Sequence, residues 1–393
     1  YKIVKKISKK DRNLSMKKKI LIEGWRYINH SYALVNQFQI KELIKNKNLD
    51  IYFFDVPYFN PNWNKSDNHS GFDNYDFLKN LKKPNPNSNF DLIYRISYPP
   101  NLSGGNAKQI FVFGNSEFQN LDGIVGKKNI DNSKNINEKI KIIVPSNWSK
   151  KGFLSFGIPE NKIFVIPHGV NQEIFKPISD SEKKKVRKEY NLSRNNFIFL
   201  NLGAMTWNKG IDKLILAFAI TNKKFPHTKL ILKDQSNLYN LKAENLIKTV
   251  QKKNSIIDKK VWSNILVISK NLSLNNLNLL YGASDAYVSP YRAEGFNLPP
   301  LEAASSGLPV ILTDGGSTDD YFNKSFAIKI KSKLIKKDNN IFLEPDLENL
   351  IDTMSLLVEK KFHNFNFNKT QNFIKKNFSW SSVVKKLSLI MNF

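Results

Sequence analysis

The sequence predicts an α/β protein built from two doubly wound domains, and three observations carry this prediction. Short apolar runs of strand length alternate along the chain with segments of helical length. These runs form two series, separated near Pro177 to Glu182. The chain has 393 residues, which is long for one hydrophobic core and ordinary for two domains. We therefore expect two open parallel sheets with helices on both faces.

The first domain is expected over residues 16–177, after a basic N-terminal tail at 1–15. Its predicted strands are the apolar runs Ile20–Ile22, Ile51–Phe54, Leu92–Tyr94, Ile110–Phe113, Ile142–Val144 and Phe164–Ile166. The connection over 57–89 is rich in Asn and Pro and long for a link between strands. We interpret it as a loop on the substrate side or a mobile insertion.

The second domain is expected over residues 178–368, with residues 369–393 as a separate closing element. Its predicted strands are Phe197–Leu200, Leu230–Leu232, Ile265–Ile268, Ala286–Val288 and Val310–Leu312. Helices are predicted between them, for example at Asp212–Phe225 and Leu272–Tyr281.

Composition narrows the class of protein. Hydrophobic residues make up 41% of the chain and aromatic residues 12%, which is ample for buried cores. The chain has no cysteine, and this excludes a disulfide scaffold, a thiolate metal site and a cysteine nucleophile. The start of the chain is too short and too charged for a signal peptide, and no stretch has the roughly 20 apolar residues of a membrane span. We expect a cytoplasmic protein.

The net charge of +27, with an isoelectric point near 9.8, leaves several partners open. Nucleic acid, an anionic membrane or an anionic substrate would each suit it, and so would a solvated lysine surface that reflects biased composition alone. The lysines are spread along the chain, and there is no arginine-rich arm or RNA-binding signature. We expect no nucleic acid partner, and we keep peripheral association with anionic membranes as an alternative.

The segment "RAEGFNLPPLEAASSGLPVI", residues 292–311, predicts a ligand site. It follows a predicted strand, and Pro299 and Pro300 mark the first turn of a helix. Ligands of open α/β sheets bind beyond the carboxyl ends of strands, and the amino end of a helix suits a phosphate. Gly295 would let the backbone approach that ligand. Glu294 and Glu302 could each accept hydrogen bonds from sugar hydroxyls, although Glu302 could also be a simple helix-dipole acid.

A second segment, "FLNLGAMTWNKGIDKLILAFAI", residues 199–220, has the same organisation. A strand ends near Gly203, a loop follows, and Lys209 and Gly210 precede a helix. A lysine at that position can neutralise a diphosphate. Taken alone, it is more often only a solvated side chain.

Together these segments resemble the retaining glycosyltransferases of family 4, which have the GT-B fold of two Rossmann-like domains facing across a cleft. The resemblance rests on the two glutamates, which have seven residues between them, and on four further segments. These are "ASSGLPVILTDGGSTDDYF", "KIFVIPHGVNQEIFKP", "VPSNWSKKGFLSFGI" and "NFSWSSVVKKLSLI". The last is similar to the family's closing helix, which often crosses back to the first domain.

The resemblance implies a role for each matching residue. Glu294 would contact donor-sugar hydroxyls, Glu302 the ribose, and Lys209 the diphosphate. The backbone of Phe296, Asn297 and Leu298 would contact the sugar and the phosphates.

The sequence departs from the family pattern at two places. The family usually has an arginine directly after the glycine that corresponds to Gly203, whereas this chain has Ala204. Lys233 is a candidate substitute. The family's glycine-rich first loop is also absent, and His30 and Ser31 lie where acceptor or donor phosphate should pass. His30 could equally be only a capped surface histidine.

The resemblance implies retaining transfer of a hexose from a nucleotide-diphosphate sugar to a hydroxyl of a glycan, lipid or protein-linked sugar, with no metal and no other cofactor. The chain carries no dinucleotide-binding glycine motif, no Walker A loop and no zinc-protease motif. Two alternatives stay open. One is a catalytically degenerate GT-B protein that binds an anionic polymer or membrane, which Ala204 favours. The other is an epimerase or phosphorylase of the same architecture.

Overall fold

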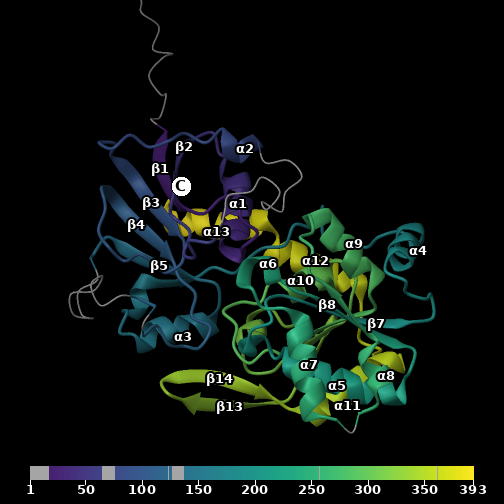
Figure 1. The fold of residues 1–393 in the computed structure, drawn as a ribbon. Helices are drawn as coiled ribbons and strands as arrows, with labels where there is room; N and C mark the ends of the chain where they lie inside the picture. The colour runs from purple at the N-terminus through teal and green to yellow at the C-terminus, as the bar shows by residue number, and fades with distance from the viewer. Residues whose placement is uncertain (1–16, 64–75, 123, 126–136, 256, 361) are drawn as a thin grey trace, which may run out of the picture.

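The computed structural model describes residues 17–63, 76–122, 124–125, 137–255, 257–360 and 362–393. It contains two six-stranded parallel sheets, each in its own domain, and a two-stranded hairpin (Figure 1). This confirms the predicted α/β class with two doubly wound domains. The expected basic tail at 1–15 and part of the long connection at 57–89 lie outside the described residues.

The first domain has the sheet order β2-β1-β3-β4-β5-β6. All neighbouring strands in it are parallel, and each predicted apolar run coincides with one of them. The strands are β1 (Lys18–Gly24), β2 (Leu49–Asp55), β3 (Phe90–Ile96), β4 (Ala107–Phe113), β5 (Ile140–Val144) and β6 (Ile163–Val165). The helices are α1 (Ser31–Leu43), α2 (Asp76–Lys79) and α3 (Asn147–Ser155).

The second domain has the order β12-β11-β10-β7-β8-β9, which is the strand order of a dinucleotide-type Rossmann sheet. Its strands are β7 (Phe197–Leu202), β8 (Thr228–Lys233), β9 (Ile265–Ile268), β10 (Ala286–Ser289), β11 (Val310–Thr313) and β12 (Ala327–Ile330). Its helices are α4 (Asp180–Glu189), α5 (Ile211–Lys224), α6 (Ser236–Tyr239), α7 (Ala243–Lys253), α8 (Lys259–Trp262), α9 (Leu274–Ala283), α10 (Pro299–Ser305) and α11 (Leu347–Val358). In such an order the direction of winding reverses between β7 and β10, and ligands bind at that switch point.

The hairpin of β13 (Ser332–Lys337) and β14 (Asn340–Pro345) was not predicted, because β13 is rich in lysine and has no continuous apolar run that would mark a strand. Its tip reaches the loop after β4 in the first domain. The Ile341 amide donates to the Phe118 carbonyl at 2.8 Å, and the Asn120 side chain donates to the Asn340 side chain at 3.2 Å. The hairpin therefore bridges the two domains.

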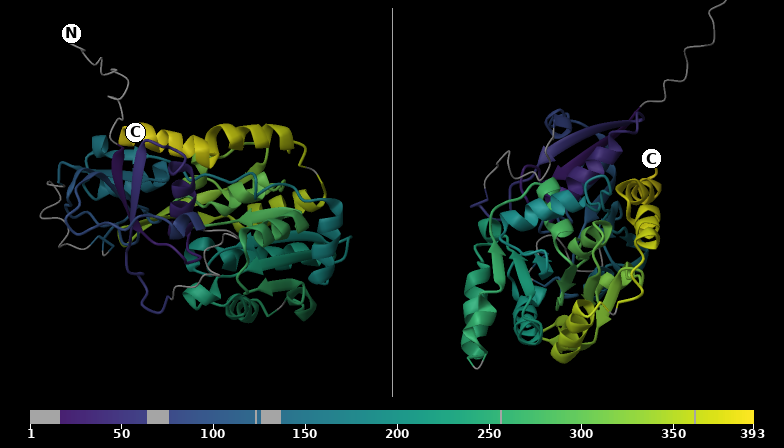
Figure 2. Two further views of the ribbon diagram at one scale, coloured as in Figure 1. Left: turned by 90° about the horizontal axis from the view of Figure 1, so that it is seen from above. Right: turned by 90° about the vertical axis from the view of Figure 1, so that its right-hand side faces the viewer.

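The chain returns to the first domain at its end. Helix α12 (Phe367–Phe378) is followed by α13 (Trp380–Met391), and the two run along one side of both domains (Figure 2). Trp380 stacks on Phe38 of α1, with ring centroids 5.1 Å apart. Because both rings are buried, this contact fastens the C-terminal helix to the first domain.

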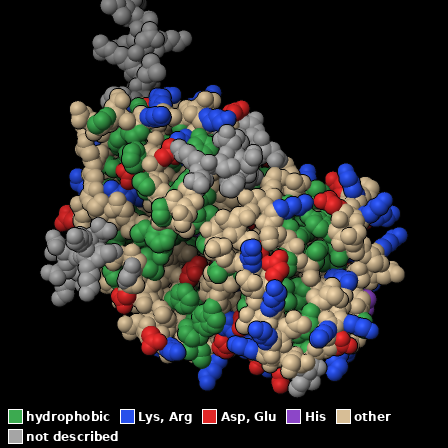
Figure 3. Space-filling model, in the orientation of Figure 1, with side chains coloured by type: hydrophobic (Ala, Val, Ile, Leu, Met, Phe, Trp, Pro, Cys, Tyr) green, Lys and Arg blue, Asp and Glu red, His purple; other side chains and the backbone are tan. Residues whose placement is uncertain are grey.

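The charge is distributed over the surface. Lys and Arg side chains lie scattered and interspersed with Asp and Glu on the face that Figure 3 shows. Within the described part of the chain, none of the helices is both long enough and apolar enough to cross a membrane.

Candidate active site

A cavity of about 790 Å³ lies between the two domains. Its walls come from the segments that follow the carboxyl ends of β1 to β4 and β6 in the first domain and of β7 to β10 in the second. This is where ligands of parallel α/β sheets bind. Most of the residues predicted for the site line it: His30, Ser31, Gly203, Lys209, Lys233, Glu294, Phe296, Asn297, Leu298 and Glu302.

Two loops at the switch point of the second sheet are held together by their backbones. The Arg292 amide donates to the Asn208 carbonyl at 2.7 Å, and the Asn208 side chain donates to the Ala293 carbonyl at 3.0 Å. Gly210 has a φ of +68°, and an added Cβ would lie 1.9 Å from the Pro290 carbonyl oxygen. Only glycine fits there, so the loop after β7 lies directly against the loop after β10.

This contact brings Lys209 to Glu294. Lys209 Nζ lies 2.6 Å from Glu294 Oε1, in an ion pair whose carboxylate is buried. Burial alone would lower the pKa of Lys209, but the carboxylates of Glu294 and Glu117 outweigh it and hold that pKa above its usual range. The lysine is therefore fully charged and faces the cavity.

Glu117, in the loop after β4, is the third charged group of this cluster. One of its oxygens accepts a hydrogen bond of 2.9 Å from the Asn208 side chain. Burial raises the pKa of Glu117 to about 7, with Lys209 opposing the rise and Glu294 adding to it. Glu117 belongs to the first domain and Asn208 to the second, so their hydrogen bond crosses the cleft.

Glu302 lies in α10 at the other end of the same segment, as its position in the first helical turn predicts. It is buried and accepts a hydrogen bond of 3.0 Å from the Tyr281 hydroxyl. Burial raises the pKa of Glu302 to about 7, and the Tyr281 hydrogen bond only partly offsets this. A helix-dipole acid would face solvent, whereas this carboxylate lines the cavity.

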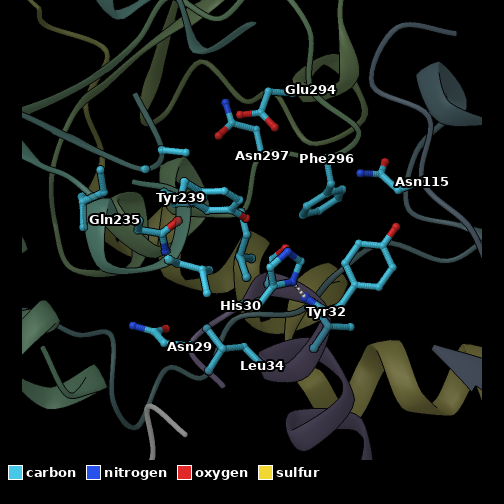
Figure 4. Close-up of a pocket in the computed structure, with 18 of the residues that line it drawn as sticks. Asn29, His30, Tyr32, Leu34, Asn115, Gln235, Tyr239, Glu294, Phe296 and Asn297 are labelled. Carbon is cyan, nitrogen blue, oxygen red and sulfur yellow. Dashed lines mark hydrogen bonds between the residues drawn. The ribbon is translucent and has the colours of Figure 1, made fainter. Parts of the chain in front are cut away.

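The residues between the two glutamates form the upper wall in Figure 4, with His30 and Tyr32 facing them from below. Asn297 has a φ of +66°, and its side chain donates to the Ser289 hydroxyl at 2.8 Å. The Tyr321 hydroxyl donates to the Asn297 carbonyl at 2.7 Å. Phe296 packs against His168, with ring centroids 4.9 Å apart. The loop is thus held in a single conformation that presents Phe296 to the cavity.

Gly295 differs from the expectation that it lets the backbone approach a ligand. It is not among the lining residues of the cavity, and an added Cβ would lie 1.4 Å from the Asn115 side-chain oxygen. Its carbonyl accepts hydrogen bonds from Ser146 and Ser149 of the first domain at 2.5 and 3.3 Å. The glycine is required by the close approach of the two domains.

Gly203 and Lys233 lie on the wall where the family's arginine is missing. Gly203 has a φ of +144°, and a Cβ added there would meet nothing within 4 Å, so this wall has free space. Lys233 is buried and its ammonium donates to the Asp234 carbonyl. Burial lowers the pKa of Lys233.

His30 caps α1 and lines the cavity at the same time. Its Nδ1 accepts a hydrogen bond of 3.2 Å from the Tyr32 amide, and the ring is buried. The alternative of a capped surface histidine does not fit, because the ring is buried and itself caps the helix. Burial, aided by Lys209, lowers the pKa of His30 to about 4, so the ring is neutral at pH 7 and Nε2 carries the proton. Ser31 lines the same wall and is exposed.

Several lining residues were missed by sequence reasoning, among them Tyr32, Trp63, Tyr98, Glu117, His168 and Tyr239. Glu117 and Tyr98 each come shortly after a predicted strand, which is a usable signal because strand ends face the cleft. Trp63 gave no such signal, because its position depends on the fold of a long connection. Its indole donates to the Leu238 carbonyl of the second domain at 2.9 Å.

No group of three or more His, Cys, Asp and Glu side chains that could hold a metal ion occurs among the residues with described positions. The expectation that the reaction needs no metal stays a prediction.

A segment of the chain is 27% identical over 164 residues to mannosylfructose-phosphate synthase of Agrobacterium fabrum, covering 41% of this chain and 34% of that protein. Another is 27% identical over 203 residues to alpha-galactosylglucosyldiacylglycerol synthase of Streptococcus pneumoniae, covering 49% and 48%. The matches thus span less than half the length of these relatives.

The fold is similar to that of HepE of Anabaena, solved in complex with UDP and glucose. The TM-score is 0.67 at 13% identity, over 95% of this chain and 99% of that one. At this identity the likeness concerns the fold alone, and it supports the GT-B arrangement of two Rossmann-like domains. Residues 182–380, just over half of the chain, match the family described as glycosyl transferases group 1. The cavity at the switch point, the paired glutamates and this match agree, and the chain belongs to the glycosyl transferases group 1 family.

Proposed function

We propose that the protein transfers a hexose, with retention of anomeric configuration, from a nucleotide-diphosphate sugar to a hydroxyl acceptor. The observation that carries this proposal is the position of Lys209, Glu294 and Glu302 along one wall of one cavity. Lys209 is paired with Glu294 at one end of the segment 294–302, and Glu302 lines the same cavity at the other end of that segment. This order matches a donor with a sugar, a diphosphate and a ribose.

Each residue has a role in the proposed reaction. Glu302 accepts hydrogen bonds from the ribose, Lys209 binds the diphosphate, and Glu294 binds hydroxyls of the donor sugar. Phe296, Asn297 and Leu298 form the wall against which that sugar lies. His30 and Ser31 face it from the first domain, and the neutral imidazole offers its Nε2 proton as a hydrogen-bond donor.

In the reaction, the acceptor oxygen forms a bond to the anomeric carbon while the bond from that carbon to the diphosphate oxygen breaks. The hydroxyl proton passes to the departing diphosphate. Lys209 stabilises the negative charge that develops there, and such stabilisation is worth several kcal/mol in a site that excludes water. The interdomain contacts at Gly295 and Glu117 close the cleft and limit hydrolysis of the donor. The proposed reaction uses no metal ion and no cofactor.

A thermal-shift panel of nucleotide sugars tests the proposal. A ligand present at 100 times its dissociation constant stabilises the folded state by roughly 2.7 kcal/mol, so the correct donor should raise the melting temperature clearly. The matching nucleotide diphosphate should give part of this shift, and sugars without a nucleotide should give none. If none of the common nucleotide sugars stabilises the protein, donor binding and the proposed transfer are both refuted.

The second candidate function is non-catalytic binding of an anionic polymer or membrane, and the observation that favours it is Ala204. This residue is buried and uncharged where the family usually carries a cation. Release of free sugar from the stabilising nucleotide sugar separates the two functions, because a degenerate protein would bind without turnover.

A further inference from the structure

The described residues of the first domain line the cavity with almost no charge. The chain has 61 Lys and Arg residues, yet only Lys209 and Lys233 are among the described residues that line the cavity, and both belong to the second domain. His30 and His168 also line it, but burial lowers their pKa values to about 4 and about 3, so neither is a cation at neutral pH. Glu117 is the one ionisable carboxylate among the described lining residues of the first domain.

Aromatic side chains of the first domain line the cavity instead. Phe59 and Tyr98 meet edge to face with ring centroids 5.0 Å apart, and Tyr98 lies 6.3 Å from Tyr32. Phe59 is 56% exposed, so part of its ring is free to contact a ligand in the cavity. All three rings line the cavity. They form an aromatic wall on the side opposite Glu302.

Two polar groups accompany the aromatic wall. The Asn115 oxygen accepts a hydrogen bond of 2.9 Å from Ser149, which turns the Asn115 nitrogen toward Phe296 and the pocket in Figure 4. Glu117 is half-buried, uses one oxygen for Asn208 and lines the cavity. Asn115 is therefore a donor and Glu117 an acceptor, two residues apart on one loop. This is the pairing that a hydroxyl requires, since a hydroxyl both accepts and donates.

We infer that the acceptor is an uncharged sugar residue, whose apolar face lies on the aromatic wall of Phe59, Tyr98 and Tyr32 and whose hydroxyls are bound by Asn115 and Glu117. The inference rests on the proposed function and names its acceptor. The charged residues of the cavity select against a phosphorylated sugar as acceptor. A phosphate on the acceptor would enter a cavity that formally holds three glutamates against two lysines and, in the reacting complex, a diphosphate as well. Like charges placed together in a low-dielectric site select against a ligand.

The test compares neutral and phosphorylated acceptors with one donor. The donor is the nucleotide sugar that stabilises the protein in the thermal-shift panel. The acceptors are methyl glycosides of glucose, galactose and mannose, together with the phosphate monoesters of the same glycosides, assayed at about pH 8 so that Glu117 is ionised. We expect kcat/KM for the best neutral glycoside to exceed that of its phosphate ester by at least roughly tenfold.

Two variants connect this preference to the named residues. Glu117→Gln removes the charge and keeps the shape of the side chain. The ratio of kcat/KM for the neutral acceptor to that for its phosphate ester should therefore decrease. Glu173→Gln, an exposed glutamate outside the cavity, is its control. Phe59→Ala removes the platform and should raise the acceptor KM severalfold, whereas Phe54→Ala, an equally exposed phenylalanine that does not line the cavity, should leave it unchanged. Calorimetric binding of the nucleotide to each variant shows whether the donor site is intact.

The outcomes separate the two proposals. Failure of every nucleotide sugar to bind refutes the proposed function itself. If the donor binds but a phosphate ester is the better acceptor, or no glycoside accepts at all, the acceptor inference is overturned while donor binding stands. It is equally overturned if Glu117→Gln and Phe59→Ala act no differently from their controls.

Discussion

Lys209 and Glu294 form an ion pair of 2.6 Å at the point where the second sheet reverses its direction of winding. The pair joins the loop after β7 to the loop after β10. It also means that the positive charge of Lys209 is already balanced by the Glu294 carboxylate before a ligand binds. A diphosphate that binds Lys209 must therefore compete with Glu294, which would then be released to face the sugar.

Replacing Lys209 by alanine should nearly abolish transfer. The missing arginine at Ala204 and the engagement of Lys233 with a backbone carbonyl leave Lys209 as the main cation for the diphosphate. Loss of one preorganised electrostatic contact of this kind costs about a hundredfold to a thousandfold in turnover. Steady-state kinetics would measure it, with exposed Lys223→Ala as control. Retention of most activity would show that another cation holds the phosphates.

Replacement of Glu302 and replacement of Glu294 should impair different properties, namely nucleotide affinity and turnover. Glu302→Ala should weaken binding of the free nucleotide and of the nucleotide sugar alike, by roughly tenfold to a hundredfold, because a hydrogen bond to a charged group is worth about 1.5 to 3 kcal/mol. Glu294→Gln should lower turnover and leave nucleotide affinity the same or higher, because it frees Lys209 for the diphosphate.

Calorimetry with the nucleotide and kinetics with the nucleotide sugar together test this contrast. The assignment of separate roles is wrong if both variants lose nucleotide affinity equally, or if neither variant differs from the wild type.

The raised pKa of Glu302 predicts how stability changes with pH. The folded state holds this proton more tightly than the unfolded state, so the favourable contribution of Glu302 is complete below its ordinary pKa of 4.5 and is lost as the pH rises through about 7. Glu302→Gln does not ionise. At about pH 8 the variant should be more stable than the wild type by up to roughly 3 kcal/mol, and near pH 4 the two should be alike.

Urea unfolding at both pH values measures this difference. Glu173→Gln, whose carboxylate is exposed, serves as the control and should show no pH-dependent gain. A gain for Glu302→Gln that is equal at both pH values would contradict the linkage.

Gly295→Ala should separate the domains locally without unfolding them. The added Cβ would lie 1.4 Å from Asn115, and relief of this clash must move the loop 294–298 away from the first domain. Misplacement by about 1 Å near the reacting groups costs roughly a hundredfold in rate. The control is Gly104→Ala, where the nearest atom would be 3.4 Å away. Full activity of Gly295→Ala would show that this contact is dispensable.

The net charge of +27 predicts peripheral association with anionic membranes. Each basic residue near an anionic surface contributes about 1 kcal/mol at low salt, and the attraction weakens as salt screens it. Vesicle sedimentation with neutral and anionic lipids at low and high salt measures this. Equal binding to both kinds of vesicle at low salt would remove the membrane as a partner and leave the scattered lysines as a solvated surface.

Much of the fold was predictable because parallel strands buried on both faces are continuous apolar runs. Eleven of the strands follow directly from such runs, from Ile20–Ile22 to Val310–Leu312. The sequence also determined which segments of the second domain line the cavity. Glu294, Glu302 and Lys209 each follow a strand or begin a helix, and the chemistry of those positions is local.

Only the tertiary structure decided what faces these residues. The place of Glu117 shortly after a predicted strand is a local signal, but its partner Asn208 lies 91 residues away in the other domain and could not be predicted. The reason for a glycine at position 295 could not be predicted either, because it depends on how closely Asn115 of the first domain approaches. Local patterns record the periodicity of buried side chains, whereas the contacts across a cleft depend on the relative placement of two domains. No short-range pattern encodes that placement, so most of the first-domain residues that line the cavity, His30 and Ser31 excepted, became visible only in the folded molecule.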